Sequence, residues 1–190
     1  MTKEELRKLY IKKRSSLSDS EYRELNDELC EIFFQSVDLS GIRILHSFLP
    51  IEKQKEPNTL QLILQIMERY RNLRIVIPRV NERTETLENI LLESTTVLKT
   101  SGWGIPEPES GAVIDADKIG MVLVPMLIFD RSGHRVGYGR GFYDKFLSTT
   151  SHNCKHVGIC LFDPVDRIDN IMEFDVRLDQ CITPSRSYIF

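Results

Sequence analysis

The sequence lacks the long apolar segments that would place the chain in a membrane or direct it out of the cell. Its longest apolar stretch is nine residues, 121–129, and a proline interrupts it. A helix that spans a membrane needs about 20 apolar residues. The N-terminal segment 1–14 is highly charged and has no apolar core of a secretion signal. We therefore expect a cytoplasmic protein that does not associate with membranes.

Cysteine is sparse and shows no pattern of disulfide or redox motifs. The four cysteines are scattered and form no CxxC pair; they are Cys30, Cys154, Cys160 and Cys181. A small secreted domain would use closely spaced cysteines as disulfide staples, but this chain has 190 residues and no signal segment. We predict four reduced thiols.

Several catalytic and binding signatures are also missing. The sequence contains neither a GxxxxGK[ST] phosphate loop nor a GxSxG nucleophile turn, and its four histidines form no catalytic set. Nucleophilic hydrolysis and zinc chemistry therefore have no support. The formal net charge is −3, which argues against a protein whose main task is to coat nucleic acid. The length and the 41% apolar content fit one globular domain with a real core.

Strand and helix patterns alternate along the chain. Residues 3–14 and the segment after a capping box at 18–21 predict an N-terminal pair of helices. Buried strands are predicted over 42–49, 74–80, 121–129, 156–162 and 180–183, with weaker strand candidates at 85–92 and 96–99. Helices are predicted from 57 or 59 to about 70 and from about 141 to 147.

This alternation predicts an α/β fold: a single domain over residues 1–190, with a largely parallel mixed sheet flanked by helices. In the helix that ends near residue 70, we expect Leu60, Ile63, Leu64 and Met67 to face inward. The segment 101–111 is rich in glycine and proline, so we expect no regular structure there.

A glycine-rich loop gives the strongest indication of a site. Gly137, Gly139 and Gly141 alternate after a buried strand and lead into a helix that carries Asp144 in its first turn. Exposed backbone N–H groups in such a loop can bind phosphate. Arg135 and Arg140 add positive charge, and Asp144 could hold magnesium. The alternative is a simple turn in which Asp144 favours the helix dipole.

Further candidates each allow two interpretations. Lys3 and Arg7 are four residues apart, so they form either a clamp for polyphosphate or part of a solvated helix face. Glu56 follows a strand end, where α/β sheets bind ligands, or it is a surface acid. Trp103 either covers the core or offers a flat surface to an aromatic ligand. Asp175 is a second metal carboxylate or a turn residue.

Taken together, these motifs resemble those of the 5-formyltetrahydrofolate cyclo-ligase family, also called 5,10-methenyltetrahydrofolate synthetases. The matching segments occur in one order over nearly the whole chain: Lys3 to Arg7, 49–59, 104–108, 124–147 and 174–176. The match at 124–147 is long and highly specific. The chain departs from the pattern at four positions: Met126 replaces a glycine, Phe142 a tyrosine and Phe174 a histidine, and Arg140 stands where relatives have glycine or lysine.

The resemblance implies a reaction. An enzyme of this family uses ATP and Mg²⁺ to convert 5-formyltetrahydrofolate into 5,10-methenyltetrahydrofolate, with phosphorylation of the formyl oxygen and release of ADP and phosphate. It implies a small-molecule substrate, with or without a polyglutamate tail, and no nucleic acid partner. We expect a monomer.

The resemblance also implies roles for particular residues. Residues for ATP would be Lys3, Arg7, Arg135, Val136, Gly137, Tyr138, Gly139, Arg140, Gly141, Phe142 and Tyr143. Asp144 and Asp175 would hold magnesium, and Arg140 and Asp144 would be catalytic. The folate would contact Ile51, Glu56 and Trp103.

Two other functions remain open from the sequence. The departures at Met126 and Phe142 would suit a nucleotide or folate sensor that binds without turnover. The basic N-terminal helix, with six basic side chains against two acidic ones in residues 3–14, would suit a nucleic-acid adaptor. The net charge of −3 disfavours the adaptor.

Overall fold

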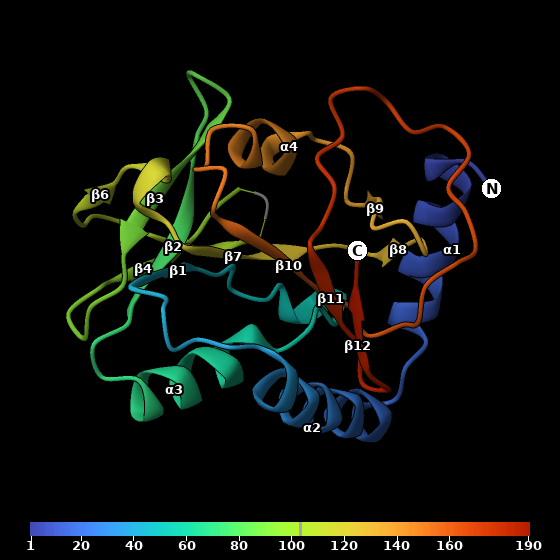
Figure 1. Ribbon diagram of the computed structural model, residues 1–190, viewed down its shortest axis with the longest axis horizontal. Helices are drawn as coiled ribbons and strands as arrows, with labels where there is room; N and C mark the ends of the chain where they lie inside the picture. Colours follow the sequence, from blue (N-terminus) through green and yellow to red (C-terminus); the bar gives the residue numbers. More distant parts are fainter. Residues whose placement is uncertain (103) are drawn as a thin grey trace.

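A mixed sheet forms the centre of the molecule in a computed structural model that describes residues 1–102 and 104–190 (Figure 1). In these residues it has eight strands in the order β12-β11-β10-β7-β1-β2-β3-β6. The strands are β1 (Ile44–His46), β2 (Arg74–Asn81), β3 (Thr86–Leu91), β6 (Val113–Ile114), β7 (Met121–Pro125), β10 (Lys155–Ile159), β11 (Gln180–Ile182) and β12 (Ser187–Ile189). Strands β11, β10, β7, β1 and β2 run parallel, and β3, β6 and β12 add antiparallel edges.

Helices cover both faces of this sheet. The helices are α1 (Lys3–Ser15), α2 (Asp19–Ser36), α3 (Thr59–Arg69) and α4 (Phe142–Leu147), with short 3₁₀ helices η1 (Glu52–Gln54) and η2 (Ala116–Lys118). Figure 1 shows α2 and α3 below the sheet and α4 above it. The predicted capping box is present: the Ser18 side chain accepts from the backbone N–H of Glu21, and Glu21 accepts from that of Ser18. The predicted α/β class and N-terminal helical pair are confirmed.

The core is divided by the sheet into two layers. Because successive side chains of a strand point to opposite faces, Met121 and Leu123 of β7 pack with residues of α2 and α3. Val122 and Val124 of the same strand pack with residues of α1 and α4. Both faces of β7 are therefore covered, which explains why its sequence is apolar throughout.

The predicted inward face of α3 is wrong in most of its members. Ile63 is fully buried, but Leu60, Leu64 and Met67 are exposed. The residues that face the sheet are Leu62, Ile63 and Ile66. This helix is apolar at so many positions that two stripes compete, and the pattern alone does not decide which stripe meets the sheet.

The predicted strand over 121–129 is divided in two. β7 ends at Pro125, which has no N–H to donate to a neighbouring strand. The following β8 (Ile128–Phe129) pairs instead with β9 (Arg135–Val136) as a separate antiparallel pair. This change of partner places the glycine loop directly after β9.

Two other expectations about strands need correction. The segment 101–111 is not irregular throughout, because β5 (Pro106–Pro108) pairs with β4 (Leu98–Thr100). The sequence also gave no indication of β12, which pairs with β11 at one edge of the sheet. In the part of the chain that the structure describes, no helix has both the length and the apolarity needed to cross a membrane.

Candidate functional site

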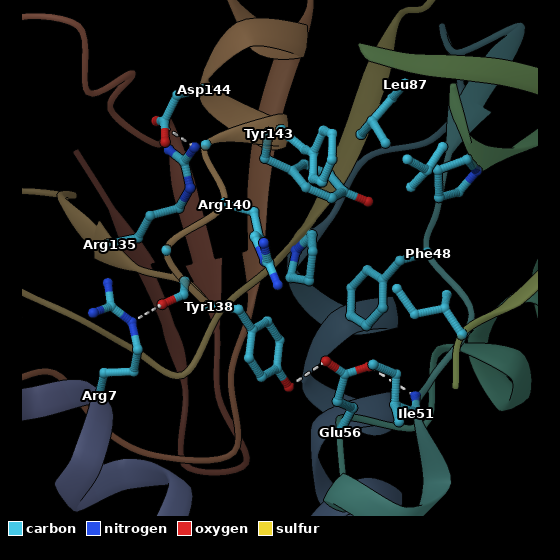
Figure 2. Close-up of a pocket in the computed structure, with 18 of the residues that line it drawn as sticks. Arg7, Phe48, Ile51, Glu56, Leu87, Arg135, Tyr138, Arg140, Tyr143 and Asp144 are labelled. Atoms are coloured by element: carbon cyan, nitrogen blue, oxygen red, sulfur yellow. Dashed lines mark hydrogen bonds and ion pairs between the residues drawn. The ribbon is translucent and has the colours of Figure 1, made fainter. Parts of the chain in front are cut away.

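A cleft of about 530 Å³ opens at the carboxyl ends of the parallel strands. The loop after β1, the ends of β2 and β7, the glycine loop, α1 and the segment before β11 all contribute to its wall. Figure 2 shows Arg7, Arg140, Tyr138 and Glu56 around it. Among described residues, every one that the sequence assigned to a ligand lines this cleft, with the exception of Val136.

Val136 is the described candidate that does not line the cleft. Val136 is 1% exposed, and its side chain belongs to the hydrophobic core. Val136 is paired with Ile128 in the small β8–β9 sheet, directly before the glycine loop. Trp103 lies outside the described residues.

The glycine loop is held against helix α1. Gly139 has a φ of +91°, in the region that favours glycine. A Cβ added there would lie 3.2 Å from the guanidinium carbon of Arg7. Arg7 in turn donates from Nε to the carbonyl oxygen of Gly137 at 2.9 Å (Figure 2). The helix and the loop therefore pack together directly, and Arg7 is positioned at the cleft by this contact.

Asp144 forms a partly buried ion pair with Arg135. Arg135 Nη2 donates to Asp144 Oδ1 at 2.7 Å, and the backbone N–H of Val176 donates to the same oxygen at 3.3 Å. Arg135 is only 8% exposed. Burial lowers the pKa of its guanidinium, and the neighbouring Asp144 carboxylate opposes that shift. Both of these hydrogen bonds use Oδ1, so, among contacts within the described residues, Oδ2 is the oxygen best placed to meet a cation.

Asp175 forms a similar ion pair with Lys3. The Lys3 ammonium donates to Asp175 Oδ2, and the backbone N–H of Met172 donates to the same oxygen at 2.6 Å. Both side chains of the pair are largely buried. This contact ties the start of α1 to the segment before β11.

Asp144 and Asp175 are suitable magnesium ligands only in partnership with a phosphate. Within residues 1–102 and 104–190, no cluster of three or more His, Cys, Asp or Glu side chains could hold a metal ion. Magnesium commonly binds one or two protein carboxylates and completes its shell with water and substrate phosphate oxygens. Two carboxylates beside a glycine loop and several basic residues fit that mode of binding.

Glu56 is buried, so its interpretation as a surface acid is wrong. It is 3% exposed and accepts from the backbone N–H of Ile51 at 2.7 Å through Oε2. Its other oxygen accepts from the Tyr138 hydroxyl (Figure 2). That hydroxyl itself accepts from Nη2 of Arg14. Burial raises the pKa of Glu56, and these hydrogen bonds and the charge of Arg14 act in the opposite direction.

The sequence missed Arg14 and the apolar walls. Arg14 is 3% exposed, while its neighbours Lys12 and Lys13 are exposed. All three belong to one basic run, and nothing in that run distinguishes the buried member. The apolar residues on the cleft wall lie in strands and loops whose orientation follows only from the fold; they include Phe48, Pro78, Val80, Leu87, Ile105 and Pro125.

Comparison with a family model decides the relationship of this chain. The model of the 5-formyltetrahydrofolate cyclo-ligase family matches residues 1–184. This chain belongs to that family. The resemblance inferred from the motifs is thereby confirmed.

Curated cyclo-ligases are similar to the chain at modest identity. A 5-formyltetrahydrofolate cyclo-ligase of Mycolicibacterium smegmatis is 26% identical over 196 residues, which cover 99% of this chain and 96% of that protein. A probable cyclo-ligase of Caenorhabditis elegans is 27% identical over 61% of this chain, and one of Schizosaccharomyces pombe is 31% identical over 50%. The chain spans 62% and 54% of the length of these two relatives.

Two solved structures of the cyclo-ligase family share the fold. The NMR structure of Aquifex aeolicus 5,10-methenyltetrahydrofolate synthetase has a TM-score of 0.84 at 24% identity and covers 100% of this chain and 93% of its own. A synthetase from Mycoplasma pneumoniae has a TM-score of 0.77 at 22% identity, with coverage of 97% and 99%. At these identities the likeness establishes the fold.

Proposed function

We propose that this protein is a 5-formyltetrahydrofolate cyclo-ligase that consumes ATP in the presence of Mg²⁺. The observation that carries the proposal is the convergence of the predicted ligand residues on one cleft. Lys3, Glu56, the glycine loop and Asp175 come from distant parts of the sequence and share its wall. Family membership, through the match over residues 1–184, gives that convergence its chemical interpretation.

The reaction needs an activated formyl oxygen. A formyl group on nitrogen is amide-like and a weak electrophile. The formyl oxygen attacks the γ-phosphorus of ATP, the bond from that phosphorus to the ADP oxygen breaks, and ADP leaves. N10 of the folate then attacks the formyl carbon, the carbon–oxygen bond breaks to release phosphate, and N10 loses its proton. Such a phosphoryl transfer depends on positioning and charge neutralisation, and no protein nucleophile is needed.

The residues of the cleft suit these requirements. The backbone of the loop from Gly137 to Gly141, with Arg7 and Arg140, would hold the polyphosphate. Asp144 and Asp175 would hold magnesium, which supplies positive charge to the phosphate oxygens when bound. Ile51 and Glu56 would contact the folate, and the apolar wall beside them would exclude water. Arg140 would stabilise charge that develops on the transferred group.

The direct test is an assay with purified protein. We expect methenyl-folate absorbance to appear only when 5-formyltetrahydrofolate, ATP and Mg²⁺ are all present, with one ADP formed per product. Absence of product under these conditions would overturn the proposal. Tight folate binding in calorimetry without turnover would instead support the sensor.

The magnesium role of Asp144 is tested by Asp144→Asn. We expect turnover to fall about 100-fold or more, because the amide cannot supply the negative charge that attracts Mg²⁺. The amide oxygen can still accept from Arg135, so the fold should survive, and circular dichroism checks this.

A matched control for this variant is Asp166→Asn. Asp166 also pairs with an arginine, Arg131, at 2.9 Å, but it is 92% exposed and does not line the cleft. Its turnover should equal that of the wild type. Near-normal turnover of Asp144→Asn at saturating magnesium would contradict the metal role.

A further inference from the structure

A buried series of hydrogen-bonded polar groups runs from the cleft into the sheet. It begins at Tyr143 in the first turn of α4, whose hydroxyl lies 3.2 Å from Nε2 of His46 at the end of β1. Nδ1 of His46 lies 3.0 Å from Oδ1 of Asn89 in β3. Nδ2 of Asn89 donates to the carbonyl oxygen of Ile114 in β6 at 3.3 Å. The His46 side chain is completely buried, and Asn89 is 4% exposed.

The donor and acceptor of every hydrogen bond in this series follow from its last member, the carbonyl oxygen of Ile114. The Ile114 carbonyl can only accept, so the amide nitrogen of Asn89 must face it and the amide oxygen must face His46. That oxygen also only accepts, so His46 carries its proton on Nδ1. Nε2 of the neutral ring is then an acceptor, and the Tyr143 hydroxyl donates to it.

Burial keeps His46 in this neutral form. Desolvation lowers the pKa of His46 to about 3, and the hydrogen bond to Asn89 opposes that shift only in part. The imidazole ring also packs on Phe146, with ring centroids 4.7 Å apart, and meets the Tyr143 ring edge-on at 5.8 Å. His46 therefore contacts two residues of α4, the helix that follows the glycine loop.

We propose that His46 is a positioning residue for the nucleotide part of the cleft. It accepts the hydroxyl proton of Tyr143 in a hydrogen bond, which fixes the tyrosine ring on the cleft wall and takes its hydroxyl out of ligand binding. Tyr143 then presents an apolar ring to the nucleotide at a set angle, next to Asp144 (Figure 2). The identity of the ligand as ATP rests on the proposed function.

The first test reads the tautomer and needs no activity. A long-range ¹H–¹⁵N NMR spectrum of the intact protein should show one histidine with its proton on Nδ1 and a hydrogen-bonded Nε2. Loss of this signal in His46→Gln assigns it, and Tyr143→Phe should shift its Nε2 resonance. A proton on Nε2, a protonated ring, or a Nε2 resonance unchanged in Tyr143→Phe would overturn the proposal, whatever reaction the protein catalyses.

The second test compares two substitutions of His46. The amide oxygen of Gln can reach the place of Nε2 and accept from Tyr143, whereas Asn reaches only the place of Nδ1. His46→Asn and Tyr143→Phe should each raise KM for ATP about five- to tenfold, as expected for one lost hydrogen bond, and leave kcat within about twofold. His46→Gln should keep KM within about twofold of the wild type.

A double variant and a control complete the test. His46→Asn combined with Tyr143→Phe should raise KM no more than His46→Asn alone, because both remove the same contact. The control is His156→Gln: His156 is also partly buried and hydrogen-bonded, with Nε2 2.9 Å from Thr150 Oγ1, but it does not line the cleft. His156→Gln should lower thermal stability and leave KM for ATP unchanged. An unchanged KM in His46→Asn, or equal impairment of His46→Gln, would overturn the proposal.

Discussion

Glu56 places a carboxylate where little water reaches it, so its ionisation costs more than in an unfolded chain. Burial raises the pKa of Glu56 above its ordinary value of 4.5. A carboxyl group whose pKa is raised by folding binds its proton more tightly in the native state. The native state therefore loses stability as the pH rises above about 4.5 and Glu56 ionises.

The loss of native-state stability with rising pH gives a prediction for Glu56→Gln. The amide does not ionise, so the free energy of unfolding of the variant, relative to the wild type, should increase from about pH 4 to about pH 7. Urea unfolding at several pH values measures the difference. The exposed Glu52→Gln, four residues earlier, is the control for loss of a carboxylate at the surface. A flat difference for Glu56→Gln would contradict the effect of burial.

At the residue scale, charge type was easier to predict than burial. The sequence singled out Glu56, Asp144 and Asp175 as ligand candidates, and all three line the cleft. It could not show that Arg14 is buried. It also could not show that Asp175 pairs with Lys3, because that contact joins segments 172 residues apart, or that Asp144 pairs with Arg135, because that contact depends on how the glycine loop folds back. Val136 was assigned with its loop, but alternation in β9 turns its side chain into the core.

The glycine loop illustrates what an element contributes beyond its residues. Gly139 and Gly141 both adopt positive φ, at +91° and +74°. A Cβ at Gly139 would press on the Arg7 guanidinium, whereas nothing lies within 4 Å of one at Gly141. Substitution by alanine therefore strains the backbone at both positions but displaces Arg7 at only one.

We predict that Gly139→Ala and Gly141→Ala each lose about 1 kcal/mol of stability through backbone strain. Gly139→Ala should in addition weaken ATP binding, since it disturbs Arg7 and its bond to the loop. Thermal unfolding and calorimetric titration with the nucleotide measure the two effects. If both variants bind ATP equally well, the contact between Arg7 and the loop does not contribute to binding.

Helices were predicted well where the sequence pattern allowed only one interpretation. The helix at 3–15 was expected over 3–14, and the start of the helix at 19–36 was expected from its capping box. The face of α3 was not, because Leu60 and Leu64 are as apolar as Leu62 and Ile66, and only packing on the sheet selects the second pair. β12 was missed because this edge strand has only three residues, too few to show an alternating apolar pattern.

The interior of the whole molecule also protects its thiols. All four cysteines are free of disulfide bonds and buried. Burial raises the pKa of Cys154 to about 11 and that of Cys160 to about 12, so neither is a thiolate near neutral pH.

We predict that a thiol reagent reacts slowly with the native protein and reaches four equivalents only in denaturant. The reaction at about pH 8, followed by absorbance, measures this. Rapid reaction of one thiol in the folded protein would show that its surroundings open more readily than the described packing allows.

The match to the family extends over residues 1–184. One domain over 1–190, a monomer and a cytoplasmic location stay predictions.

The ion pair between Lys3 and Asp175 joins positions 172 residues apart in the sequence. During synthesis on the ribosome, α1 emerges before the segment that carries Asp175. Until then, the cleft lacks one wall, and Lys3 has no carboxylate at that place. A nascent chain that already contains both α1 and the glycine loop therefore still has an incomplete cleft, so assembly of the site waits for the segment that carries Asp175.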